Sequence, residues 1–454
     1  MPIEPPRFVA PQAWVNGAWA DDVLLSVAAD GNWDRIEPHA SAQAQHGVTR
    51  LPGPVLPGLV NGHSHAFQRA IVGLTERAGA GDDDFWSWRD RMYSAANRIT
   101  PDQLEAIAAQ LYAELLASGY TQVCEFHYLH NGLDGRPTAD PLEMSLALVR
   151  AAARVGMGLT LLPTLYMRSG FGATGLRDDQ RRFASTPDSV LRMAESITRL
   201  ADNARVRSGV ALHSLRAVDE AALREVATAA AGRMPVHIHI AEQQQEVADC
   251  LAHHGQRPID WLLGQVSVDA SWNLVHATDA SAAELAGVRA AGAAIVICPS
   301  TEANLGDGVF DLPTWIGQGG QWSIGSDSHV TRCWQEELRL LEYSQRLSLR
   351  RRNIAATAAQ GGSSAAALFQ GALQGGSAAA GLPLGGLAAG QRADFMVIDT
   401  HAPALLGVPP DHLLDALVFS SPGAQPAQVY VAGTAVTKTD TSAAFVEAMQ
   451  ALWR

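Results

Sequence analysis

The stretch GLVNGHSHAFQRA, residues 58–70, places two histidines one residue apart at the end of an apolar run. That run, residues 55–60, is typical of a buried strand. Side chains two positions apart on a strand point to the same side, so we expect His63 and His65 to converge at its C-terminal end. Two imidazoles directed at one point indicate a metal site.

Seven further apolar runs follow, and stretches with a helical pattern, such as residues 101–118, separate most of them. The predicted strands lie at residues 55–63, 120–128, 158–166, 209–215, 235–242, 272–278, 293–299 and 321–327. Eight strands that alternate with helices predict an α/β fold of the parallel (β/α)8 TIM-barrel type, because a barrel closes at that number.

Residues before 55 are predicted to form short strands, with Asn16-Gly17 and Asp30-Gly31 as hairpin turns. Strand character returns at residues 393–400 and 427–436. The simplest assembly joins both ends of the chain in a small β-sandwich domain into which the barrel is inserted. The expected division is residues 1–54 and 386–454 for the small domain, which includes a terminal helix, and residues 55–385 for the barrel.

The composition predicts a cytoplasmic protein that acts on a small molecule. A net charge of −13 argues against nucleic acid or an anionic membrane as a partner. The chain shows neither an apolar run long enough for a membrane span nor a signal-peptide pattern. Its four cysteines lie far apart, without a CxxC pair, which is typical of free thiols in a reducing compartment.

Further polar residues occur where the predicted strands end, which is the end where barrel enzymes carry their chemistry. Together with the first two histidines, the set is His63, His65, His239, Glu242, His276 and Asp327. His237 lies on the same strand face as His239, but we assign it no metal role. A lone histidine is most often structural, whereas this ordered set on successive strand ends predicts a metal-dependent active site.

The predicted metal ligands supply three nitrogens and one oxygen, a set suited to zinc: His63, His65, His239 and Asp327. Iron or manganese could occupy the same set. Zinc brings the pKa of bound water down toward ~7. Asp327 would accept the proton of that water, Glu242 would carry a proton to a leaving nitrogen, and His276 would polarise the group under attack. The predicted reaction is hydrolysis at an sp2 carbon.

Several motifs resemble those of the amidohydrolase superfamily, over almost the whole chain: PGLVNGHSH, HIHIAE, LVHAT, GSDSH and LGGLAAGQRADFMVID. Members with two metals usually bridge them with a carboxylated lysine. This chain has no lysine before Lys438. The resemblance therefore implies one metal ion per chain, as in the deaminase branch, whose His-x-x-Glu is also present.

Within that branch the chain resembles the formimidoylglutamate deiminases, on the stretches GHSHAFQRAIVGLTER, DFWSWRDRMY, EFHYLH, HSLRAV and PSTEANLGDG. The resemblance implies hydrolysis of N-formimino-L-glutamate, a small dianion, to N-formyl-L-glutamate and ammonia in histidine degradation. It implies that the substrate is held by Gln68, Arg89, Tyr128, His213 and Arg216. Related barrels commonly pair, so we expect a homodimer.

The two arginines agree with this substrate on physical grounds. Arg89 lies in the stretch at residues 82–93, which we interpret as a polar-aromatic loop after the first strand, and Arg216 follows the strand at residues 209–215. Both would lie on the catalytic side of the barrel, where a planar guanidinium group binds a carboxylate through two hydrogen bonds.

Two alternative functions remain open at this point. A zinc-dependent deaminase of a nucleobase or another heterocycle would use the same metal site, but it should not need two anion-binding arginines. A catalytically silent barrel could keep zinc ligands for stability, but it has little reason to keep Glu242 and His276.

Overall fold

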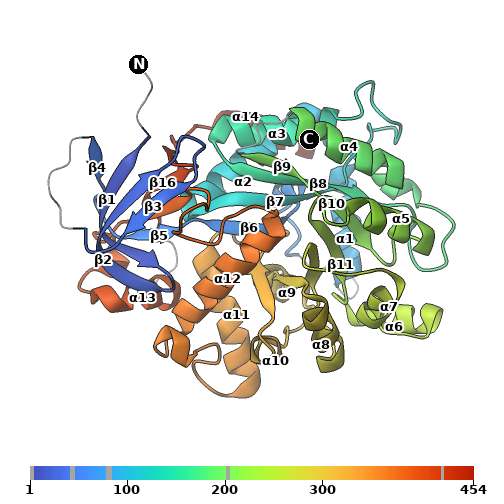
Figure 1. Cartoon of the computed structure of the whole chain (residues 1–454). Helices are drawn as coiled ribbons and strands as arrows, with labels where there is room; N and C mark the ends of the chain where they lie inside the picture. Colours follow the sequence, from blue (N-terminus) through green and yellow to red (C-terminus); the bar gives the residue numbers. More distant parts are fainter. Residues whose placement is uncertain (1–4, 41–46, 78–83, 201–204, 421–423) are drawn as a thin grey trace.

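A barrel of eight parallel strands makes up the larger part of the computed structural model, which describes residues 5–40, 47–77, 84–200, 205–420 and 424–454 (Figure 1). In barrel order, the strands are β6 (Leu59–Ser64), β7 (Tyr120–His127), β8 (Gly158–Leu165), β10 (Val210–Ser214), β11 (Val236–Ile240), β12 (Trp272–His276), β13 (Ala294–Ile297) and β14 (Gln321–Ile324). A parallel bridge between Ser64 and Asp327 brings the first and last strands together. The predicted (β/α)8 barrel is confirmed.

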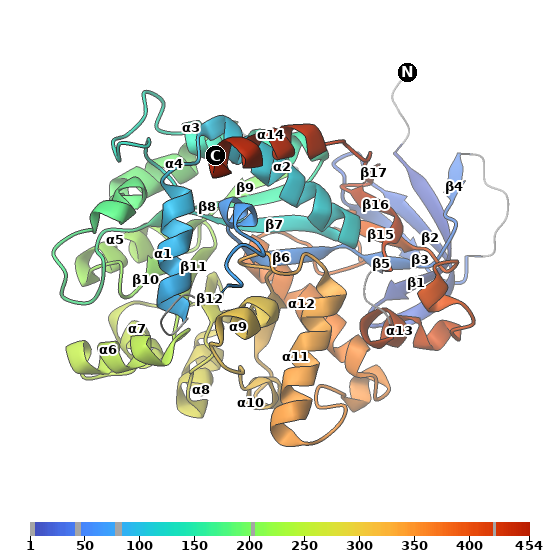
Figure 2. The same ribbon diagram turned by 180° about the vertical axis from the view of Figure 1, so that it is seen from behind.

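Helices cover the outside of the barrel (Figure 2). They are α2 (Pro101–Ser118), α3 (Glu143–Val155), α4 (Pro187–Leu200), α5 (Glu220–Ala230), α6 (Gln244–His254), α7 (Pro258–Gln265), α8 (Ala282–Ala291), α9 (Pro299–Leu305), α10 (Leu312–Gly317), α11 (Trp334–Leu349) and α12 (Ser364–Ala380). Helix α2 has the predicted bounds because Thr100 and Gln103 form a capping box at its start, and Gly119, at φ 104°, ends it. Within the described ranges, no helix is long and apolar enough to span a membrane.

The first predicted strand, at residues 55–63, is in fact two strands. Residues Val55–Pro57 form β5, which pairs with the small sheet, and the barrel strand β6 begins at Leu59. Gly58 connects the two strands. A side chain would not fit at this position, because a Cβ atom would lie 2.4 Å from Cγ2 of Thr121. An apolar run cannot show that its two halves belong to different sheets.

The two ends of the chain meet in one further sheet beside the barrel (Figure 1). Its strands are β1 (Arg7–Val15), β2 (Ala18–Val27), β3 (Trp33–Glu37), β4 (Val48–Arg50), β5, β15 (Phe395–Ile398), β16 (Pro426–Val431) and β17 (Thr434–Ala435). The predicted turn at Asn16-Gly17 joins β1 to β2, and both residues have the positive φ that this turn requires. Phe8, Trp33 and Phe395 belong to the separate apolar core of this sheet.

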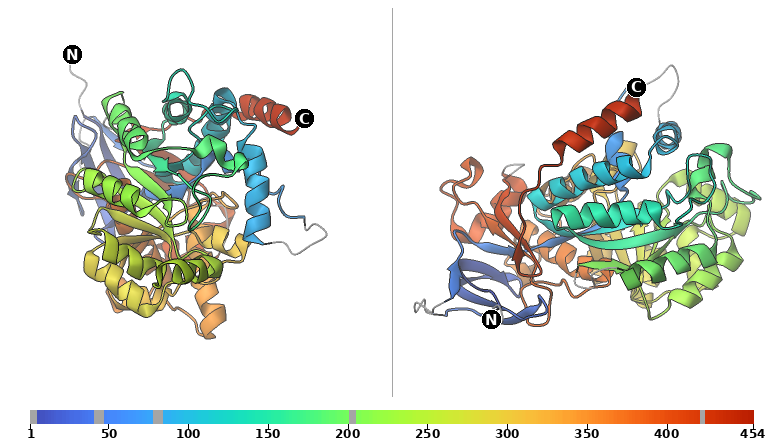
Figure 3. Two further views of the ribbon diagram at one scale, coloured as in Figure 1. Left: turned by 90° about the vertical axis from the view of Figure 1, so that its right-hand side faces the viewer. Right: turned by 90° about the horizontal axis from the view of Figure 1, so that it is seen from above.

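After β17 the chain returns to the barrel. The last helix, α14 (Ser442–Trp453), runs beside α2, as seen from above in Figure 3. The indole nitrogen of Trp453 donates to the carbonyl oxygen of Ala70 at 3.2 Å. Ala70 ends the short 3-10 segment η1 (Ala66–Ala70), which follows β6 and carries Gln68. The far end of the chain thus contacts the segment next to the His63 and His65 pair.

Candidate active site

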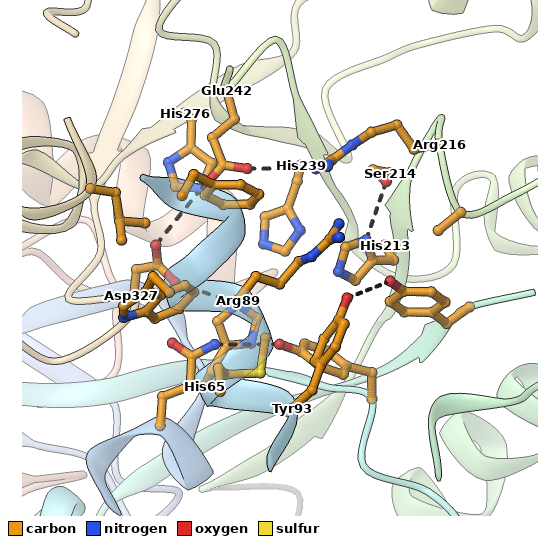
Figure 4. Close-up of a pocket in the computed structure, with 18 of the residues that line it drawn as sticks. His65, Arg89, Tyr93, His213, Ser214, Arg216, His239, Glu242, His276 and Asp327 are labelled. Carbon is orange, nitrogen blue, oxygen red and sulfur yellow. Dashed lines mark hydrogen bonds and ion pairs between the residues drawn. The ribbon is translucent and has the colours of Figure 1, made fainter. Parts of the chain in front are cut away.

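Four predicted metal ligands converge at the C-terminal end of the barrel. The Nε2 atoms of His63 and His65 on β6 are 3.1 Å apart, and Nε2 of His239 on β11 lies 3.0 Å from that of His63. Oδ1 of Asp327, just beyond β14, lies 3.4 Å from Nε2 of both His63 and His65. Figure 4 shows His65, His239 and Asp327 among the side chains that line the pocket.

This spacing fits a metal ion. In a tetrahedral zinc site with bonds of about 2.0–2.1 Å, neighbouring ligand atoms are about 3.3 Å apart. Nδ1 of His65 donates to the carbonyl oxygen of Phe126 at 2.9 Å, so its Nε2 carries the lone pair that a metal needs. Burial lowers the pKa of His63 to about 3, which keeps this imidazole neutral. The site can therefore hold a metal ion.

A buried carboxylate holds the backbone around the first two ligands. Glu125 on β7 accepts hydrogen bonds from Oγ of Ser64 and from the backbone nitrogen of Ala66, each at 2.6 Å. These two residues flank His65. The sequence analysis missed Glu125, because its position within an apolar strand gives no sign of which loop it contacts.

Glu242 lies just past the end of β11 and faces the ligand cluster. Its Oε1 is 3.6 Å from Nε2 of His276, and its Oε2 is 3.7 Å from a terminal nitrogen of Arg216. Burial raises the pKa of Glu242 to about 7, against the opposing charges of His276 and Arg216. A carboxyl group with this pKa can both release and accept a proton near neutral pH.

His276 ends β12 and is held by a second carboxylate. Its Nδ1 lies 3.3 Å from Oε1 of Glu302, which also accepts the backbone N–H of Cys298 at 2.8 Å. Burial alone would lower the pKa of His276, but Glu242 and Glu302 outweigh it and raise the pKa to about 10. Glu302 belongs to the stretch PSTEANLGDG. The sequence analysis quoted this stretch but assigned no role to Glu302.

All five predicted substrate-binding residues line the same pocket as Glu242 and His276: Gln68, Arg89, Tyr128, His213 and Arg216. The two guanidinium groups lie near the ring of Trp86, with that of Arg89 4.4 Å and that of Arg216 5.6 Å from its centroid. Gln68 donates to the hydroxyl of Tyr128 at 3.3 Å.

Several polar atoms in this pocket are buried without a hydrogen-bond partner among the described residues. They are Oε1 of Gln68 and the Nε atoms of Arg89 and Arg216. Buried polar groups are normally hydrogen-bonded, so their common position in one pocket indicates a place for a polar ligand.

Arg89 does not lie on a loop, contrary to the sequence interpretation. It belongs to helix α1 (Phe85–Ala96), whose start is capped by Asp84 through the backbone nitrogens of Trp86 and Ser87. Residues 82 and 83 of the predicted loop lie outside the described residues. The aromatic residues obscure the helical pattern because Trp88 and Tyr93 line the pocket and also pack against the apolar core.

The backbone at the strand ends adopts unusual conformations. Ala241, His276 and Asp327 have φ values of 50°, 71° and 44°, in the left-handed region that residues other than glycine rarely adopt. Such strain occurs mainly at functional sites. His237, the strand histidine to which we assigned no metal role, makes a structural contact instead. Its Nε2 donates to the carbonyl oxygen of Ala379 at 2.9 Å, away from the ligand cluster.

Several known proteins resemble this chain in sequence and in fold. The chain is 46% identical over 429 residues to "Formimidoylglutamate deiminase" of Pseudomonas aeruginosa, with 94% of each chain covered. An amidohydrolase crystal structure from Brucella melitensis has a TM-score of 0.92 at 42% identity and covers 99% of this chain and 100% of its own. An adenosine deaminase from Xanthomonas campestris with bound zinc shares the fold, with a TM-score of 0.79 at 22% identity and coverage of 99% and 98%.

The family model of amidohydrolases matches residues 55–436, which include the whole barrel and four of the eight strands of the small sheet. That range contains every ligand and pocket residue described above. By this match, and by its close relative over nearly the full length, the chain belongs to the amidohydrolase family.

Proposed function

We propose that this protein hydrolyses N-formimino-L-glutamate to N-formyl-L-glutamate and ammonia, with one zinc ion per chain. The observation that carries the proposal is the pair Arg89 and Arg216 in the same pocket as the histidine and aspartate cluster. A dianionic substrate needs two cationic partners, and planar guanidinium groups suit carboxylates. The similarity to the Pseudomonas aeruginosa deiminase supports this substrate.

Zinc would be held by the four converging ligands: His63, His65, His239 and Asp327. When bound there, zinc would lower the pKa of a water molecule toward ~7 and so supply the nucleophile at neutral pH. The neutral imidazoles and the ligand spacing support this assignment.

The carboxylates and His276 would manage the protons of the reaction. Asp327 takes a proton from the attacking water as a C–O bond forms at the formimino carbon. Glu242, with its pKa near neutrality, delivers a proton to the terminal nitrogen as the C=N double bond becomes a single bond. Asp327 then gives the proton that it took to the same nitrogen, the C–N bond breaks, and ammonia leaves. The hydroxyl group on the carbon returns its proton to Glu242 as the carbonyl group forms. The nitrogen gains two protons and the water gives up two, so the reaction balances. His276, held by Glu302, stabilises charge at the carbon under attack.

The first test is ammonia release from N-formimino-L-glutamate, with metal content determined on the same sample. We expect turnover with about one zinc per chain. Glu242→Gln should lower kcat by about 1,000-fold without loss of zinc, because only the proton transfer is removed. Glu195→Gln, at a half-buried surface position on α4, is the matched control and should behave like the native protein. Turnover by Glu242→Gln at the native rate would exclude the proposed proton shuttle.

The second test separates this proposal from a heterocycle deaminase. Arg89→Met and Arg216→Met should each lower kcat/KM for N-formimino-L-glutamate by about 10- to 100-fold, because a charge-assisted hydrogen bond to a carboxylate is lost. A heterocycle deaminase has no such requirement. Activity on an aminoheterocycle that both variants retain, with no turnover of N-formimino-L-glutamate, would favour that alternative.

A further inference from the structure

Two tyrosine hydroxyls meet at the wall of the pocket opposite Glu242. Tyr93 on α1 and Tyr166, just beyond β8, have hydroxyl oxygens 3.1 Å apart, and both side chains are buried. Both line the pocket that holds Arg89 and Arg216. Figure 4 shows Tyr93 with its hydroxyl joined by a dashed line to a neighbouring tyrosine. Neither residue belongs to the predicted binding set.

Gln180 fixes the direction of the hydrogen bonds in this pair. It lies fully buried in the 3-10 segment η2 (Asp178–Phe183), and its Oε1 accepts the backbone N–H of Arg177 at 3.0 Å. This contact requires that the amide nitrogen face the other way. That nitrogen lies 3.2 Å from the hydroxyl of Tyr93 and 3.0 Å from that of Tyr166. Both phenolic oxygens therefore accept a hydrogen from Gln180.

Counting the hydroxyl hydrogens then leaves one without a partner. Each phenol has one hydrogen, and one of the two lies in the bond between the hydroxyls. Within the described part of the chain, neither oxygen makes a further hydrogen bond beyond those to the other phenol and to Gln180. Burial raises the pKa of Tyr166, so this hydroxyl stays protonated at neutral pH. The remaining hydrogen is available to an acceptor in the pocket.

The surroundings of the pair favour an anionic acceptor. The guanidinium carbon of Arg89 lies 5.5 Å from the ring of Tyr93. A carboxylate that is bound by an arginine at this wall would have a further lone pair for a hydroxyl donor.

We propose that Tyr93 and Tyr166 are specificity-determining residues that donate one hydrogen bond to a carboxylate oxygen of the substrate, with Gln180 as the positioning residue that orients them. The inference rests on the proposed function, because it assigns a further contact to the same dianionic substrate. It predicts that the pair acts on substrate binding and not on the chemical step.

The test uses Tyr93→Phe, Tyr166→Phe and the double variant, all in the zinc-loaded enzyme. The double variant has no hydroxyl donor, so KM for N-formimino-L-glutamate should rise by about 10-fold or more while kcat stays within about threefold. In each single variant KM should rise less. Gln180 still donates to the remaining hydroxyl, and the hydrogen of that hydroxyl is then free to bind the substrate. Tyr120→Phe is the matched control, because this buried tyrosine does not line the pocket. It should leave both constants unchanged.

Two substrate analogues, each lacking one of the two carboxylates, separate recognition from a structural effect. For the analogue without the contacted carboxylate, kcat/KM should be the same in the native and double-variant enzymes. For the other analogue, kcat/KM should fall in the double variant by as much as it does for the full substrate. Equal losses on all three compounds, or no loss on any, would overturn the inference.

Gln180→Glu offers a second test, because it reverses the direction of the hydrogen bonds at this pair. The new carboxylate can still accept the N–H of Arg177, but it accepts a hydrogen from each phenol instead of donating one. No hydrogen then remains for the ligand, and KM for the dianion should rise. The same substitution in the double variant, which has no hydroxyls, measures the effect of the added charge alone on KM. The difference between the two rises in KM is then due to the hydroxyl groups. Equal rises in both backgrounds would contradict the proposed role of Gln180.

The failure of this inference can be told apart from a failure of the proposed function. If the native enzyme does not hydrolyse N-formimino-L-glutamate, the proposed function fails. The pair is then tested by calorimetric titration with glutarate, a simple dianion. Weaker glutarate binding by the double variant than by Tyr120→Phe would support the contact, and equal binding would exclude it.

Discussion

Glu337 on α11 is a buried carboxyl group outside the pocket. It accepts hydrogen bonds from the backbone nitrogen and the hydroxyl of Ser300, at 2.9 Å and 2.6 Å. Burial nevertheless raises the pKa of Glu337 to about 8, because these two donors offset only part of the lost hydration. A single residue of this kind makes the stability of the whole protein depend on pH.

The sign of that dependence follows from proton uptake. In the unfolded chain the carboxyl group titrates near pH ~4.3. Between that pH and about 8, the folded protein holds a proton that the unfolded chain has lost. The contribution of Glu337 to the free energy of unfolding is therefore fully present below pH ~4.3, and it falls by up to about 5 kcal/mol as pH rises through this window.

Glu337→Gln removes this titration, so its free energy of unfolding should fall less than that of the native protein between pH 5 and 9. Denaturant titrations of both proteins at several pH values, with metal kept in excess, measure the difference. The comparison uses slopes, because the variant also loses a hydrogen bond to Ser300. Parallel curves for the two proteins would show that Glu337 does not titrate in this range.

Residue types alone pointed to the metal and proton-transfer candidates, since histidine and carboxylate side chains at strand ends are few in this chain. The supporting residues were not accessible in this way. Glu125, Glu302 and Gln180 act on groups far away in the sequence, and their partners are known only from contacts at 2.6–3.3 Å.

Helix α12 shows at the scale of an element why small residues recur in the last helix of the barrel. Its residues contact β14 and β6. A Cβ atom on Gly375 would lie 1.9 Å from the carbonyl oxygen of Trp322, and one on Gly376 would lie 2.8 Å from Cβ of Val60. The helix can approach the strands closely only because glycine stands at these two positions.

Gly375→Ala should lower the free energy of unfolding by about 3 kcal/mol, because the helix must move away from β14 to accept the methyl group. Gly264→Ala is the matched control: it lies in helix α7, and no atom lies within 4 Å of its added Cβ. That variant should be unchanged or more stable by up to about 1 kcal/mol. Denaturant unfolding of the two variants checks both values. Similar stabilities would mean that the packing of α12 adapts easily.

At the scale of the whole molecule, the candidate metal ligands come from strands that lie far apart in the chain. His239 is 176 residues from His63, and Asp327 follows the last barrel strand. A metal ion bound by these residues would link β6, β11 and β14 across the end of the barrel. It would bind the folded chain and not the unfolded one, because only folding brings the ligands together.

Removal of the metal with a chelator should therefore lower Tm. At free zinc of 1,000 times Kd, the stabilisation is about 4 kcal/mol. Thermal unfolding of the native protein before and after chelation measures the shift, and added zinc should reverse it. His63→Ala is the control, since it lacks one ligand, and its Tm should respond little to the chelator. An equal response in both proteins would place the stabilising ion elsewhere.

The amino-acid sequence by itself determined the fold class, the strand order and the residues that are candidate metal ligands. Local periodicity reports burial, and eight strands that alternate with helices have few ways to close. Only the tertiary structure decided the rest: the division of residues 55–63 into two strands at Gly58, the place of Arg89 on a helix, and the hydroxyl pair of Tyr93 and Tyr166. The physical reason is that these features depend on contacts between segments distant in the chain, which no local pattern records.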